Sequence, residues 1–206
     1  MKTLFLVIAL SSLIFVSAST PIKGVKHHHY TTYYNADKRE PDSVSWDLTS
    51  DMLCDRKPPR VAFTADPQVA GCPGAGAYDE PLNGVKYSQG HMFNFDEAKC
   101  DETDRKECFF MSNMLPQAQS FNAGDWASVE HQERRWAAAG KVHIVAGGIG
   151  SIGRLANSNV NVPDSCWKAI YHDHQWDGYI MANRPDSHGH HLASHIARFD
   201  DFERRT

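Results

Sequence analysis

The sequence predicts an α+β fold with a central, mostly antiparallel sheet. Segments with the alternation typical of strands occupy the first half of the chain. One strong helical pattern covers residues 122–140, and further apolar strand patterns follow it. Strands, one long helix and then more strands are typical of an α+β domain.

The N-terminal segment has the pattern of a cleaved signal peptide. Lys2 supplies one positive charge, an apolar run extends from Leu4 to Val16, and small residues follow. We expect residues 1–18 to be removed, because Val16-Ser17-Ala18 fits the requirement of signal peptidase. The alternative is a membrane anchor, but a crossing helix needs roughly 20 apolar residues, and this run is shorter. We therefore expect a secreted or periplasmic protein that has no membrane-spanning segment.

The rest of the chain is long enough for one domain with a hydrophobic core. We expect an N-terminal arm over residues 19–43 and the domain itself over residues 44–206. The 206 residues include 21 Lys and Arg against 25 Asp and Glu, a net charge of −4. This balance argues against a protein that coats nucleic acid through bulk positive charge, but it allows a local basic site.

Strand patterns lie on both sides of the helix. Before it, we expect strands over residues 44–49, 60–66, 85–91 and 108–114. After it, apolar runs predict strands over residues 141–150, 166–172 and 177–185. A Gly- and Pro-rich stretch over residues 67–84 indicates a loop, and the last residues, 192–206, end in a short helix.

The helix over residues 122–140 is the clearest element of the chain. Trp126, Val129 and Trp136 form an apolar stripe, the Ala-rich stretches favour a helix, and Gly140 ends it. Such a stripe is typical of an amphipathic helix.

The polar side of the same helix has two interpretations. Glu130 and Arg134 are four residues apart and share one face, and Asn122 lies at the first turn. Taken alone, they fit a solvated ion pair and a helix N-cap. A histidine at a strand end, His91, precedes them in the chain, so the same residues also fit a catalytic group.

Five cysteines are present, and export permits disulfides. We expect one bridge between Cys100 and Cys108, which bracket a charged loop, and another between Cys54 and Cys72. Cys166 lies in an apolar strand pattern and is expected to be a buried free thiol. The chain has no CxxC pair, which argues against a cysteine zinc site.

Two histidine-rich stretches allow a metal-binding interpretation. We expect the first of them, His27 to His29, to be exposed residues of the arm. The second is expected to be a solvated loop, and its histidines are His188, His190, His191 and His195. A histidine-rich extracytoplasmic metal-binding protein therefore remains an alternative.

Residues 46–206 resemble the DNA/RNA non-specific endonuclease family, which includes the endonuclease G type. The matching motifs are Gly90-His91, Ser112-Asn113 with Pro116-Gln117, and the helical series Asn122, Trp126, Glu130 and Arg134. Members have the ββα-metal (His-Me finger) fold, so the resemblance implies that fold with helices flanking the sheet. The combination of motifs is specific, whereas a Gly-His pair alone is not.

The chain departs from the family pattern at two points. The DRGH motif is Ser88-Gln89-Gly90-His91 here, so its aspartate and arginine are missing. The TGP element is replaced by AGGIG within residues 146–150. We expect the first change to affect rate and substrate preference, and the second to affect structure only.

The resemblance also implies roles for single residues. His91 is the expected general base, because a neutral imidazole accepts a proton from water near neutral pH. Asn122 is the expected direct ligand of one Mg²⁺, which Glu130 holds through water. Arg134 and Arg60 are expected to neutralise charge at the phosphate. The candidate substrate contacts are Arg60, Arg134, Arg135, Asn113 and Lys86, of which Asn113 is expected to hold the backbone of the site together.

The predicted function is that of a secreted, Mg²⁺-dependent endonuclease, with Mn²⁺ as a substitute ion. It would cleave DNA and RNA to 5′-phosphate products through phosphate contacts, without sequence specificity. One alternative is a weak or inactive protein of the same fold that binds nucleic acid or a partner. The loss of the DRGH aspartate and arginine favours that alternative.

Overall fold

A six-stranded antiparallel sheet forms the centre of the computed structural model, which describes residues 24–186. Its strands, in spatial order, are β1 (Gly24–Lys26), β2 (Tyr30–Asn35), β3 (Glu40–Leu48), β6 (Val142–Ile149), β9 (Ser165–His172) and β10 (Gln175–Ala182). Every neighbouring pair in this sheet is antiparallel. The predicted fold class is therefore confirmed.

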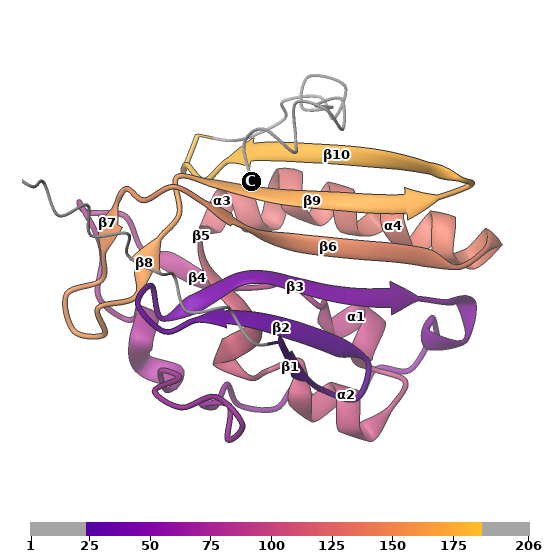
Figure 1. Ribbon diagram of the computed structural model, residues 1–206, viewed down its shortest axis with the longest axis horizontal. Helices are drawn as coiled ribbons and strands as arrows, with labels where there is room; N and C mark the ends of the chain where they lie inside the picture. The colour runs from indigo at the N-terminus through magenta and orange to yellow at the C-terminus, as the bar shows by residue number, and fades with distance from the viewer. Residues whose placement is uncertain (1–23, 187–206) are drawn as a thin grey trace, which may run out of the picture.

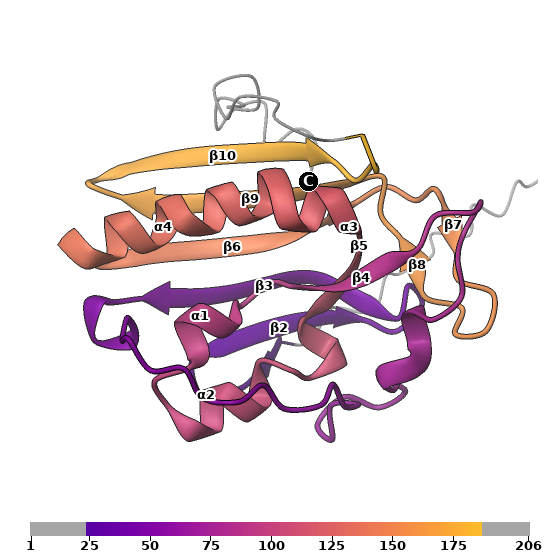
Figure 2. The ribbon, with the colours of Figure 1, turned by 180° about the vertical axis from the view of Figure 1, so that it is seen from behind.

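The helices gather on one face of this sheet, as Figure 2 shows, while the face toward the viewer in Figure 1 has none. They are α1 (Phe95–Ala98), α2 (Glu102–Glu107), α3 (Gln119–Phe121), a π-helical turn (Asn122–Trp126) and α4 (Ala127–Ala139). Two smaller sheets pair β4 (Tyr87–His91) with β5 (Met114–Ala118), and β7 (Gly153–Arg154) with β8 (Asn161–Val162). Short 3₁₀ turns cover Ser50–Met52, Ala75–Tyr78 and Met111–Asn113.

The core lies between the helices and the inner face of the large sheet. Trp46 on β3 and Ile144 on β6 are paired across the two strands, and both are buried. Trp126 and Val129, from the predicted helix stripe, are fully buried in the same cluster. The inward-facing side chains of the strands and the apolar side chains of the helix therefore form one apolar layer.

Two of the predicted strands differ from the structure. Residues 60–66 form no strand apart from a single bridge between Thr64 and Phe110. The strand expected over residues 108–114 begins only at Met114, after a 3₁₀ turn. Phe109, just before this turn, and Met111, within it, are both buried, so their apolar pattern reflects core packing and not strand pairing.

The predicted arm over residues 19–43 is wrong for residues 24–43, which belong to the domain. β1 and β2 form the edge of the large sheet, and β3 begins at Glu40. His27, expected to be exposed, is 4% exposed, and its Nε2 lies 3.1 Å from a carboxylate oxygen of Asp66. The buried carboxylate lies within ion-pair distance of the imidazole, which offsets part of the cost of placing this histidine in the core.

Some predictions concern residues outside the described part of the chain. These are the signal peptide over residues 1–18, the histidines from His188 to His195, and the helix at the C-terminal end. Within residues 24–186, no helix has the length and apolar character that crossing a membrane requires.

The disulfide joins Cys54 to Cys100, so both predicted bridges are wrong. Helix α2 separates Cys100 from Cys108, and the Cys108 side chain points into the core, where it is fully buried. Cys72 is free and half-buried. Cys166 is a buried free thiol, as predicted.

Candidate active site

The site is built on the unit formed by β4, β5 and the helix that follows. β4 and β5 pair in antiparallel register, with His91 opposite Met114. The chain then passes from β5 through α3 and the π-helical turn into α4. This ββα arrangement places the end of β4 near the start of the helix, so residues distant in sequence can share one surface (Figure 2).

A polar hollow of about 350 Å³ brings together four of the predicted residues, Arg60, His91, Asn122 and Glu130. Its other lining residues are Phe63, Ser88, Gln89, Asn94 and Gln119. A candidate base, two side chains with oxygen atoms that can bind a metal, and a guanidinium therefore line the same hollow.

His91 lies at the edge of the hollow in a mostly apolar setting. The residue is 9% exposed, and its ring contacts Phe109 at a centroid distance of 5.0 Å and Phe63 at 5.6 Å. Its Nε2 atom has no hydrogen-bond partner among the described residues. Burial, reinforced by the positive charge of Arg60, lowers the pKa of His91 to about 3. The imidazole is therefore neutral near pH 7, which is the form that a general base requires.

The glycine before His91 is required by the pairing of β4 with β5. A Cβ atom at Gly90 would lie 2.1 Å from the side chain of Gln117, which is fully buried. The two motifs, Gly-His on β4 and Pro-Gln on β5, therefore fit together as one packed unit. A larger residue at position 90 would push the strands apart and move His91.

Asn122 directly follows α3, and its side chain lines the hollow. It begins a π-helical turn that ends at Trp126, where α4 continues. Such a turn inserts an extra residue into the helical repeat, and π turns are frequent at functional sites. The predicted N-cap role is not seen, because Asn122 itself has helical backbone angles and makes no side-chain cap.

Glu130 lies two turns further along the helix and is 7% exposed. Burial raises the pKa of its carboxyl to about 7. The positive charge of Lys168 opposes this rise, the negative charge of Glu133 adds to it, and a hydrogen bond with Asn94 opposes it. A carboxyl that is costly to ionise in isolation is stabilised by a nearby cation. Asn122 and Glu130 thus form a pair of oxygen donors suited to a hard divalent ion.

Arg60 reaches the hollow from an irregular segment. Its guanidinium lies 5.1 Å from the centre of the Phe95 ring, within the range of a cation–π contact. The residue is otherwise exposed. An exposed guanidinium with an aromatic support is well placed to meet a phosphate.

The other predicted contacts lie outside this hollow. Arg134 lines a separate hollow, with one guanidinium nitrogen 3.9 Å from Glu97, and it makes no ion pair with Glu130 among the described residues. Arg135 is exposed and bonds to Gln132 on its own helix. Lys86 lines an adjacent hollow that shares Gln119 with the first.

Asn113 is fully buried, which corrects its assignment to the substrate contacts. Its side-chain oxygen accepts from the Phe93 amide at 2.9 Å, and its nitrogen donates to the carbonyls of Phe93 and Cys108. It therefore holds the backbone that follows His91, which is the supporting role expected of it.

Comparison with known proteins identifies the family. The DNA/RNA non-specific endonuclease family model matches residues 11–198. The chain belongs to this family. A nuclease of Nostoc sp. is 30% identical over 164 residues, covering 75% of this chain and 58% of that protein. The mitochondrial nuclease EXOG of Mus musculus is 28% identical over 169 residues, covering 73% of this chain and 45% of that protein.

The chain thus spans about half the length of the curated relatives it matches. A likeness of fold extends to EndoG, solved in a complex with EndoGI, at a TM-score of 0.78 and 21% identity. That match covers 88% of this chain and 82% of the EndoG chain. The family's ββα-metal fold is therefore confirmed.

Three residues that line the hollow were not predicted from the sequence: Phe63, Asn94 and Gln119. Asn94 caps α1, with its side-chain oxygen accepting from the Asp96 amide at 2.7 Å. The series Asn-Phe-Asp-Glu, three residues after His91, carries this N-cap signal in the sequence. Phe63 and Gln119 have no comparable local signal, because only the fold brings them to the hollow.

Proposed function

We propose that this protein is a secreted, Mg²⁺-dependent endonuclease that cleaves DNA and RNA without sequence specificity. The observation that carries the proposal is the shared hollow of His91, Asn122, Glu130 and Arg60. The family match supports a nuclease, and the N-terminal sequence pattern supports export. The proposed products carry 5′ phosphates, as the family resemblance implies.

The donor set fits a hard divalent cation. Asn122 offers an amide oxygen as a direct ligand, and Glu130 offers a carboxylate that would act through water. Mg²⁺ keeps several of its own waters and needs few protein ligands, so this small set is sufficient. A bound cation would stabilise negative charge on the phosphate and on the leaving oxygen.

Side chains of the protein would supply proton transfer and phosphate binding. His91, which is neutral near pH 7 and lines the hollow, would take the proton of the attacking water. Arg60 would hold the phosphate and offset the charge that develops on it. The hollow lacks the crowded apolar walls of a small-molecule pocket, which suits a polymer substrate that binds through its backbone.

Substrate binding would extend from this hollow toward Lys86. Gln119 lines both the catalytic hollow and the neighbouring one, so the two are adjacent. With a net charge of −4, the protein would rely on these local cations, and activity would fall as salt rises. A rate that is the same at low and physiological salt would argue against phosphate recognition by these residues.

The test is a nicking assay on supercoiled plasmid and on RNA, with the purified mature protein in Mg²⁺ or in chelator. We expect cleavage only with a divalent ion, and a loss of about 10²–10⁴-fold in His91→Ala. His174→Ala, at an exposed turn, serves as the matched control and should keep full activity.

A folded wild-type protein that cleaves neither substrate with any divalent ion would favour the alternative of an inactive relative. The observation behind that alternative is that Ser88 and Gln89 line the hollow where the family has aspartate and arginine. Nucleic acid binding without cleavage, measured by fluorescence anisotropy, would then distinguish a binding protein from a protein with another partner.

A further inference from the structure

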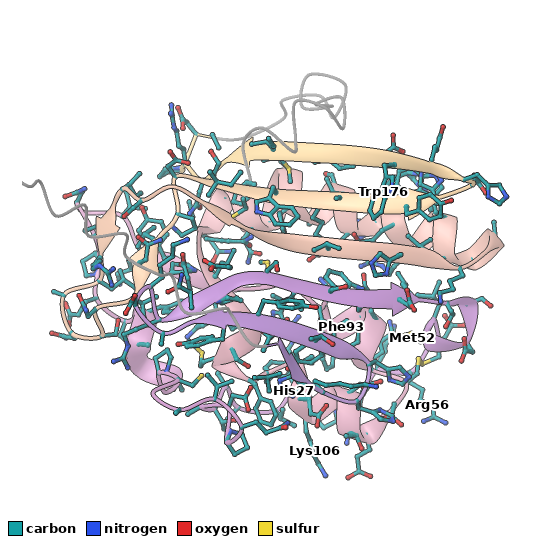
Figure 3. All side chains as sticks on the ribbon, viewed as in Figure 1. His27, Met52, Arg56, Phe93, Lys106 and Trp176 are labelled. Atoms are coloured by element: carbon teal, nitrogen blue, oxygen red, sulfur yellow. A yellow bond between two sulfur atoms is a disulfide. The ribbon has the colours of Figure 1, made fainter. Side chains whose placement is uncertain are left out.

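The three consecutive histidines between β1 and β2 have two different environments. His27 is buried against Asp66, and both side chains are 0% exposed. The side chains of His28 and His29 are 46% and 40% exposed. In Figure 3, His27 lies beside β1, while Lys106, on α2, extends away from the edge of the molecule. Only the first histidine is therefore used by the core.

His28 and His29 converge on a single carboxylate of α2. The Nδ1 atom of His28 lies 3.1 Å from one oxygen of Asp104, and the Nδ1 atom of His29 bonds to the other oxygen. Asp104 is 2% exposed, so its carboxylate lies on the inner side of the cluster, while both imidazoles are open to solvent. The three ligand atoms lie within 4.8 Å of one another.

These separations suit one small cation. Ligands placed about 2.0–2.2 Å from a tetrahedral zinc ion lie about 3.3 Å from one another. The 3.1 Å contact between His28 and Asp104 is close to that edge length, so small side-chain rotations would close the set around an ion. Asp101, whose oxygen lies 3.5 Å from the same His28 nitrogen, or a water molecule can supply a fourth ligand.

The frame around the cluster is already organised. The His28 amide donates to a carboxylate oxygen of Glu107 at 2.7 Å, and the Tyr30 hydroxyl donates to the Glu107 carbonyl at 2.9 Å. Asp101 caps α2 and accepts from the amide of Asp104 at 3.0 Å. The histidine turn and α2 are thus held together without an ion, so binding would require little rearrangement.

The ligand chemistry selects a different metal from the catalytic one. Imidazole nitrogen suits zinc and its neighbours in the transition series, whereas Mg²⁺ prefers oxygen ligands. The hollow that contains His28 and His29 shares no lining residue with the hollow of His91. We propose that His28, His29 and Asp104 form a zinc site that is separate from the catalytic centre and ties the β1–β2 turn to α2.

Zinc titration calorimetry on the metal-stripped mature protein tests this site. We expect one tight equivalent of zinc, which excess Mg²⁺ does not displace. The double variant His28→Ala, His29→Ala should lose this equivalent, and Asp104→Asn should weaken it at least tenfold. The matched control replaces His188, His190 and His191 with Ala, and it should keep the tight equivalent.

Two results would overturn the proposal. In one, wild-type protein binds no zinc; in the other, the equivalent persists in the His28 and His29 double variant. A measurement on the wild type alone guards against a misfolded variant. Carbethoxylation followed by mass spectrometry should mark His28, His29 and the exposed His174 without zinc, and of these three only His174 with zinc. Equal labelling of His28 in both conditions would also contradict the site.

Discussion

The indole nitrogen of Trp126 donates a hydrogen bond to the main-chain carbonyl of His91 at 3.2 Å. This contact joins the start of the long helix to the end of β4. Trp126 is fully buried, and its ring also lies 4.6 Å from the ammonium of Lys168, which is paired with Glu133. The helix that carries Asn122 and Glu130 is therefore tied directly to the backbone of the proposed base.

Trp126→Phe should lower kcat about 10–100-fold with little change in KM, because it removes this tie while keeping an aromatic ring in the core. The indole acts through His91, so substrate binding should be almost unaffected. Steady-state kinetics on a fluorescent oligonucleotide measures both constants. Trp176→Phe, at a residue 39% exposed on β10, is the control. An increase in KM alone would contradict a positioning role.

Gln89→Arg should restore one missing charge of the family motif. Gln89 lines the catalytic hollow, and its side-chain nitrogen donates to the Ala75 carbonyl at 3.1 Å. We expect KM to fall severalfold and the dependence of binding on log salt to steepen by about one unit. Gln175→Arg adds the same charge at an exposed site on β10. An equal effect of both variants would indicate bulk charge and not a local phosphate contact.

The Cys54–Cys100 bridge should stabilise the segment that leads to Arg60. It closes a loop with a sequence separation of 46, and loss of such a bridge typically lowers the free energy of unfolding by about 2–4 kcal/mol. We expect that change in the double variant Cys54→Ser, Cys100→Ser, measured by denaturant unfolding. Cys72→Ser, at a free thiol, should have a smaller effect. Five alkylatable thiols in unreduced, denatured protein would contradict the bridge.

Glu40 should make stability depend on pH. It is 1% exposed, and burial raises the pKa of its carboxyl from 4.5 to about 8, opposed by a hydrogen bond from Asn161. The folded state therefore holds a proton that the unfolded state releases, so this contribution is complete below pH 4.5 and is lost as pH rises through about 8.

Glu40→Gln removes this titration while keeping an oxygen that can accept from Asn161. Its free energy of unfolding, relative to wild type, should rise between about pH 4.5 and 8 and then level off. Denaturant unfolding at several pH values measures the difference. Asp37→Asn, at an exposed carboxyl, is the control. A difference that is constant with pH would show that Glu40 does not titrate in this range.

The sequence alone indicated which motifs contribute to the hollow. The Gly-His motif and the helical series that resemble the family include His91, Asn122 and Glu130, which line it together. Spacing along one helix or one strand is local geometry, which a sequence pattern expresses directly. The buried stripe of Trp126 and Val129 was predicted for the same reason.

Only the tertiary structure decided which distant residues meet. Cys100 bonds to Cys54 and not to its neighbour Cys108, because α2 turns Cys108 into the core. Arg134, one turn after Glu130, lies beside Glu97 and not in the catalytic hollow. The consecutive histidines His27 and His28 separate, one toward Asp66 and the other toward Asp104. The packing of the sheet and helices determines these partners, because they are distant in sequence. A local sequence pattern cannot predict contacts of this kind.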